Sequence, residues 1–199
     1  MAGFTPSYFA VLRTTDGVHH FHGLTATAWL VLLVLQSWLF KTQKLAWHRR
    51  LGRLSLALVP LFLLSGGLVV RTMLQARNGF NLAFGPRLAA VDVIALFTFA
   101  SAYALALRHR HELKRHARWM ISTALLVLPP ALARLLPPML GLASFETAFH
   151  SSFLLTELAV GVLLVQDRKE PWKVRAPYLA LLASLLLQQG LFVVLPCFR

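Results

Sequence analysis

The chain has 199 residues, of which 57% are hydrophobic and only 14% are charged. A water-soluble domain of this composition would expose large apolar patches and aggregate, so an ordinary soluble fold is excluded. The formal net charge of +13 would suggest nucleic-acid binding in a soluble protein. Here the cations lie in short loops beside apolar segments, where topology and anionic lipid headgroups account for them, so we expect no nucleic-acid partner.

Six apolar segments follow one another along the chain, and each is long enough to cross a lipid bilayer. We place these segments at about His22–Phe40, Leu51–Leu74, Leu88–Leu107, Trp119–Leu140, Thr147–Gln166 and Tyr178–Pro196. No short alternating segments of the β-barrel kind appear, so the pattern predicts helices. The sequence therefore predicts an all-α fold, a six-helix transmembrane bundle over residues 22–199. Residues 1–21 are expected to form an outer interfacial segment.

The basic residues predict how the bundle is oriented. Fourteen of the twenty Lys and Arg residues fall on the loops after the first, third and fifth segments. Basic loops face the cytoplasm, so both chain termini are predicted on the outer, non-cytoplasmic side. We expect a multi-pass protein of the cytoplasmic (inner) membrane, whose partners are the lipid bilayer and anionic headgroups at the basic loops.

Turn-forming and helix-breaking residues predict local features. Asn78-Gly79 and Gly85-Pro86 predict an ordered outer loop over Gln75–Arg87. Pro60 in the second segment and Pro129-Pro130 in the fourth predict kinks, and we expect the fourth helix to line a cavity. Gly66-Gly67 permits close helix contact. The glutamines inside the spans are expected to hydrogen-bond between helices; they are Gln36, Gln188 and Gln189.

Three charged residues lie inside the predicted spans: Asp92, Arg134 and Glu157. Each costs about 2.5–3.5 kcal/mol at the membrane centre if it is left without a partner. Asp92 and Arg134 both fall in the outer leaflet, so an ion pair between them is expected. Such a pair would either fix the packing of two helices or hold an anionic ligand group, and both interpretations stay open.

Histidines near the ends of four different helices suggest a cofactor. His22 and His150 lie on the outer side, whereas His48 and His116 lie on the inner side. A b-type haem is held by two neutral imidazoles from different helices, and a transmembrane electron carrier needs one such pair near each surface. The sequence therefore predicts haem b, electron transport, an outer His22/His150 pair and an inner His48/His116 pair. Structural or interfacial histidines are the alternative.

Two further functions stay open. One is a binding or transport protein with an outer-leaflet cavity, lined by Asp92, Arg134, His150 and Glu157. Glu157 follows His150 by seven residues on the same helix face, so a proton path could use both. The other is a metal-dependent membrane enzyme in which the His19-His20-Phe21-His22 stretch binds the ion and His150, Asp92 or Glu157 completes the ligand shell. The sequence contains no phosphate loop, nucleophile elbow or dinucleotide fingerprint, so no catalytic residue is assigned.

Motifs at the segment ends carry two resemblances. His22-Gly23, Trp29 and Gln36 are followed by His48-Arg49-Arg50-Leu51-Gly52 and by His116-Ala117-Arg118-Trp119-Met120. In this order, over about residues 19–140, the chain resembles a group of predicted bacterial membrane proteins of unknown function. The four helix-end histidines are also similar to those of transmembrane b-type cytochromes of the ascorbate-dependent reductase kind. That resemblance implies two haems, although here a third helix without histidine intervenes.

Overall fold

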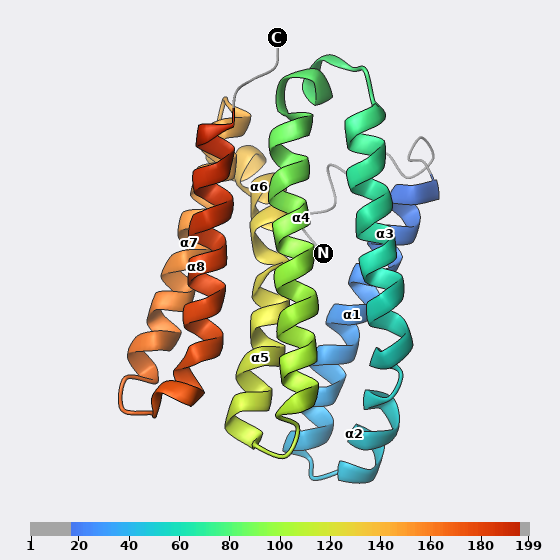
Figure 1. The fold of residues 1–199 in the computed structure, drawn as a ribbon, viewed down its shortest axis with the longest axis vertical. Helices are drawn as coiled ribbons and strands as arrows, with labels where there is room; N and C mark the ends of the chain where they lie inside the picture. The colour runs from blue at the N-terminus through green and yellow to red at the C-terminus, as the bar shows by residue number, and fades with distance from the viewer. Residues whose placement is uncertain (1–16, 196–199) are drawn as a thin grey trace. The chain divides into compact units, whose positions relative to one another are not determined.

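The computed structural model describes residues 17–195, and within this range the regular structure is entirely helical, which confirms the all-α prediction (Figure 1). In chain order the helices are α1 (Gly17–Lys41), α2 (Leu45–Gly52), α3 (Ser55–Gln75), α4 (Gly79–Arg108), α5 (Leu113–Leu125), α6 (Leu128–Leu140), α7 (Phe145–Gln166) and α8 (Trp172–Val194). Most of the predicted interfacial segment 1–21 lies outside the described residues. Residues 17–21 already belong to α1.

The helices account for five of the six predicted membrane segments, and a bent helix pair covers the remaining one. Five stretches are long and apolar enough to cross a membrane: Gly17–Lys41, Leu45–Gln75, Gly79–Arg108, Phe145–Gln166 and Trp172–Val194. The bent pair of α5 and α6 passes the same test as a sixth. Large apolar side chains such as Val34, Phe97 and Leu158 lie more than half exposed on these helices, where lipid rather than water suits them. The chain is therefore a multi-pass membrane protein, while its predicted orientation stays a prediction.

The described chain divides into two compact units, residues 17–96 and residues 97–195, with the boundary inside α4. In the first unit, α1 packs along α3, and the short helix α2 contacts both. In the second unit, α7 packs between α6 and α8, and α5 packs along α8. The two units are described separately below.

The predicted outer loop over Gln75–Arg87 is wrong, because most of it is helical. Only residues 76–78 connect α3 to α4. The Asn78 side-chain oxygen accepts the backbone N–H of Asn81 at 2.8 Å, so the turn-forming residue caps a helix instead of opening a loop. Gly85 allows a close approach to α3, since a Cβ atom there would lie 3.2 Å from the Met73 carbonyl oxygen.

Proline predicts one of the two observed helix breaks. The fourth segment bends by 40° between α5 and α6, just before Pro129-Pro130, as expected for prolines at the first positions of a new helix. The second segment breaks at residues 53–54, whereas Pro60 lies within the continuous helix α3. At that break Ser55 Oγ donates to the Gly52 carbonyl at 2.6 Å, which gives the interrupted backbone a partner.

Candidate functional site

The first candidate ligand, His48, lies on α2 in the unit of residues 17–96. Its Nδ1 is 3.2 Å from the backbone carbonyl oxygen of Gln36 on α1. Because a carbonyl oxygen only accepts, Nδ1 must carry the proton, and in the neutral imidazole Nε2 then holds the lone pair. The Phe40 ring packs edge-on against the imidazole at 6.1 Å between ring centroids. The geometry thus fixes both the tautomer and the orientation of a potential metal ligand.

A buried amide lies beside His48. The Gln36 side chain is only 8% exposed, yet within residues 17–195 neither its amide nitrogen nor its amide oxygen has a hydrogen-bond partner. Gly52, one helical turn after His48, faces this amide, because a Cβ atom at Gly52 would lie 3.7 Å from Gln36 Nε2. A buried polar group that lacks a partner in a native structure calls for an explanation, and a bound ligand that hydrogen-bonds to it is one such explanation.

The other glutamines only partly fit the predicted bonding between helices. Gln189 on α8 does so, because its Nε2 donates to the His150 carbonyl on α7 at 3.4 Å. Gln188 donates instead to Ser184 in its own helix at 3.0 Å, and Ser184 in turn contacts Thr98 of α4 at 2.7 Å. Gln36 makes no such bond within residues 17–195, so for this glutamine the prediction is wrong. Serine and threonine make these contacts because a short hydroxyl side chain fits between closely packed helices.

His22 joins α1 to α3 through a hydroxyl cluster. Its Nδ1 lies 3.0 Å from Ser65 Oγ, and its ring stacks on Phe62 with 5.3 Å between centroids. Ser65 donates its only hydroxyl hydrogen to the Phe62 carbonyl at 2.7 Å, so it accepts from the histidine. Thr25 Oγ1 completes the cluster at 2.9 Å from Ser65 Oγ.

The unit of residues 97–195 contains the two remaining histidines. His116 on α5 donates from Nδ1 to the Ala106 carbonyl of α4 at 2.8 Å, so Nε2 again holds the lone pair. The His150 ring packs edge-on against Phe149 and Phe192, at 5.4 and 5.8 Å between centroids. His116 is therefore oriented by a hydrogen bond and His150 by aromatic packing.

Each predicted haem pair takes one histidine from each unit, so both pairings stay predictions. The same holds for the ion pair between Asp92, in residues 17–96, and Arg134, in residues 97–195. The Arg134 guanidinium donates to the Pro130 carbonyl one turn earlier in α6, at 2.6 Å. Glu157 lies on the same face of α7 as His150, two turns further along, as expected. Within the described part of the chain, its buried Oε1 has no hydrogen-bond partner.

A set of ion pairs within and between two basic turns was not predicted from the sequence. Glu112 accepts from Arg115 at 2.8 Å, Lys114 contacts Glu170 at 2.6 Å, and Arg118 contacts Asp167 through both carboxylate oxygens. The sequence feature that could have revealed these ion pairs is the presence of acidic residues within otherwise basic loops. These contacts place the α4–α5 and α7–α8 turns at one end of their unit, as the alternation of basic loops predicts.

The described residues contain no ready-made set of ligands for the metal ion of the predicted metal-dependent enzyme. Among residues 17–195, no three His, Cys, Asp or Glu side chains gather as a potential metal site. In comparisons with known proteins, no sequence family, no curated protein and no solved structure matches this chain. Both resemblances noted from the sequence stay predictions.

Proposed function

We propose that this multi-pass membrane protein binds b-type haem through histidines at its helix ends and carries electrons. One observation carries the proposal: His48 and His116 each donate Nδ1–H to a backbone carbonyl of a neighbouring helix. Histidines that bind a metal characteristically donate their second ring N–H in this way, because the bond fixes the tautomer and strengthens the ligand nitrogen.

A histidine in the basic turn provides the contrast. The His109 Nε2 lies 2.8 Å from the Arg115 guanidinium, which can only donate, so the lone pair of this nitrogen is already engaged. Its Nδ1 contacts the Glu112 carboxylate at 3.1 Å. His109 is thus committed to an ion-pair network and serves as a matched control for His48 and His116.

Two features near His48 support the proposal. The Gln36 amide offers a donor and an acceptor that have no partner within the described chain. Gly52, which has no side chain, lies beside that amide, since a Cβ atom there would be 3.7 Å from Gln36 Nε2. Haem would supply an iron that gains and loses one electron reversibly. The protein would supply neutral imidazoles, an apolar setting and hydrogen bonds that hold the ligands in place.

Visible spectroscopy of the purified full-length protein tests the proposal. After expression with ample haem, we expect a Soret band that shifts on reduction. Each of the variants His22→Ala, His48→Ala, His116→Ala and His150→Ala should lower the haem content per chain, whereas His109→Ala should not. Absence of a Soret band from the folded wild-type protein, or equal losses in His109→Ala and His48→Ala, would contradict the proposal.

A second candidate function, transport through a polar cavity, is favoured by one observation. Glu157 places a buried carboxylate oxygen without a partner, among residues 17–195, on the His150 face of α7. Protons are the probe to use, followed with a pH-sensitive dye inside proteoliposomes. Proton flux that Glu157→Gln abolishes and Glu146→Gln leaves unchanged would support transport, since Glu146 lies in the first turn of the same helix. Flux that Glu157→Gln leaves unchanged would contradict it.

A further inference from the structure

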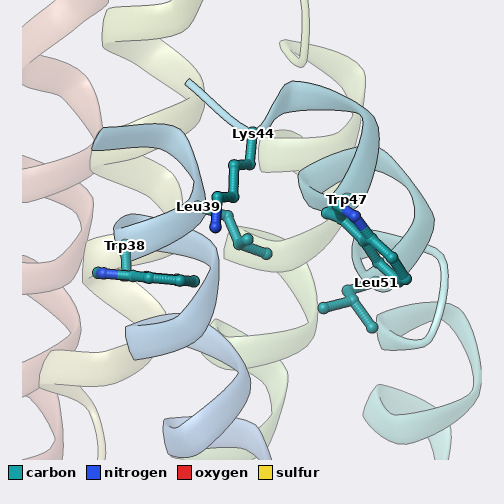
Figure 2. A pocket seen from close by; sticks show the side chains of 5 residues that line it. All are labelled: Trp38, Leu39, Lys44, Trp47 and Leu51. Carbon is teal, nitrogen blue, oxygen red and sulfur yellow. The ribbon is translucent and has the colours of Figure 1, made fainter. Parts of the chain in front are cut away.

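A hollow lies at the corner where α1 ends and α2 begins. Its volume is about 430 Å³, and it is lined by Trp38, Leu39, Lys44, Trp47 and Leu51 (Figure 2). Trp38 and Trp47 are 49% and 54% exposed, whereas Leu39 is buried. The hollow thus has an apolar floor and aromatic walls that remain open to the surroundings.

The local backbone explains why Lys44 borders this hollow. The Lys44 N–H bonds the Leu39 carbonyl at 2.9 Å, and the Gln43 N–H bonds the Phe40 carbonyl at 3.0 Å. With Gln43 in the left-handed region at φ 58°, this is a Schellman motif at the end of α1. The motif turns the chain sharply, so the Lys44 side chain reaches back over α1 (Figure 2). Its Nζ lies 4.9 Å from the centroid of the Trp38 ring.

Within residues 17–195, the cations at this corner have no carboxylate partners. The corner carries Lys41, Lys44, Arg49, Arg50 and Arg53, all of them exposed. The chain has no Asp or Glu between Asp16 and Asp92, and within residues 17–195 no ion pair involves any of the five cations. The basic turns of residues 97–195 differ, because there Glu112, Asp167 and Glu170 pair with arginine and lysine.

Aromatic rings beside the cations are a second feature that is typical of a lipid-binding site. The Arg50 guanidinium carbon lies 5.6 Å from the Trp47 ring centroid, so each tryptophan of the hollow has a cation beside it. Tryptophan prefers the headgroup level of a bilayer, where its apolar ring and polar N–H are both satisfied. A phosphate could contact Lys44 and Arg50 while the glycerol and the start of the acyl chains cover Trp38 and Leu51.

We propose that the hollow between α1 and α2 is a binding site for one anionic phospholipid. Lys44 and Arg50 bind its phosphate, and Trp38, Trp47 and Leu51 contact its apolar part. The proposal is independent of haem binding. It also goes beyond a general attraction of basic loops to the membrane, because it assigns the lipid to one of three basic turns.

Native mass spectrometry of the full-length protein in neutral detergent tests this site. Titration with phosphatidylglycerol should show one retained lipid, and phosphatidylcholine should bind more weakly. The double variant Lys44→Gln/Arg50→Gln should bind phosphatidylglycerol about twenty-fivefold more weakly, because each lost cation weakens binding about fivefold. The matched variant Arg168→Gln/Lys169→Gln removes the same charge from the α7–α8 turn and should bind as the wild type does. Both doubles change exposed side chains, and circular dichroism checks their helicity.

Four results would overturn the proposal. Equal weakening in both double variants would mean that only total charge matters, and no weakening in either would remove Lys44 and Arg50 from the site. Equal binding of phosphatidylcholine would exclude an anionic specificity. Displacement of the lipid by an equimolar amount of glycerol 3-phosphate would show that the ligand is a free phosphate ester rather than a phospholipid.

Discussion

The guanidinium of Arg118 on α5 contacts both carboxylate oxygens of Asp167, the C-cap residue of α7, with Nη2 2.6 Å from Oδ1. Both side chains are largely buried, at 16% and 13% exposed. An acid at a helix C-terminus is unfavourable, because the helix dipole places negative charge there. Arg118 offsets this repulsion and ties α5 to the α7–α8 turn.

The pair predicts a pH-dependent stability. Hydrogen bonds from Arg118 hold the pKa of Asp167 below its usual value, so the stabilisation is present above the unfolded pKa and is lost as the pH falls through the lower folded pKa. Asp167→Asn should therefore lower the free energy of unfolding by about 1–3 kcal/mol at neutral pH. The difference in free energy of unfolding between Asp167→Asn and the wild type should become smaller below about pH 4.

Thermal unfolding in detergent micelles across a pH series measures this effect. Glu170→Gln is the control, because its partner Lys114 is 61% exposed and such pairs contribute about 0–1 kcal/mol. If the difference in stability between Asp167→Asn and the wild type does not change with pH, the ion pair does not stabilise the fold.

Two buried glutamines predict opposite effects of the same substitution. In protein free of haem, Gln36→Leu should raise the free energy of unfolding by about 1 kcal/mol, because it removes a buried amide that has no partner in the described part of the chain. Gln188→Leu should lower it by about 1–2 kcal/mol, because Gln188 donates to the Ser184 hydroxyl inside the protein. Urea unfolding followed by circular dichroism compares them. A loss of stability in Gln36→Leu would mean that its amide has a partner after all.

Two adjacent glycines on α3, Gly66 and Gly67, are expected to differ in how well they tolerate a larger side chain. A Cβ atom on Gly66 would lie 2.6 Å from a methyl carbon of Leu96, whereas one on Gly67 would meet nothing within 4 Å. Gly66→Val should therefore cost about 1–3 kcal/mol, and Gly67→Val should cost much less. Valine separates the two sites better than alanine, since the Leu96 side chain can rotate away from a single methyl group. Melting temperatures of the two variants measured side by side decide the matter.

The turn after α1 predicts a stabilising substitution. Gln43 adopts φ 58°, a conformation that costs a residue with a Cβ atom about 1 kcal/mol and costs glycine nothing comparable. Gln43→Gly should raise the melting temperature in detergent, while Thr42→Gly, at the preceding residue, should lower it. The Thr42 hydroxyl donates to the Trp38 carbonyl at 2.9 Å, and glycine loses that bond. A destabilised Gln43→Gly protein would contradict this account of the turn.

Much of the fold could be predicted from the sequence, because hydropathy is summed over neighbouring residues and needs no knowledge of packing. The apolar stretch of α8, the alternation of basic loops and the bend before Pro129 all follow from local composition. The start of α4 at Gly79 could not be predicted, because Asn78 is equally able to open a turn and to cap a helix. The break at residues 53–54 is not marked by proline.

In the candidate site, too, some features could be predicted from the sequence and others could not. The sequence alone determined that His22, His48, His116 and His150 lie near helix ends, since their position depends only on the ends of the apolar stretches. Only the tertiary structure decided that His48 donates to Gln36, that His116 donates to Ala106 and that Arg118 meets Asp167. Such contacts depend on how each helix is rotated about its axis and which helix it packs against. Hydropathy and composition, which are summed over neighbouring residues in the sequence, do not contain that information.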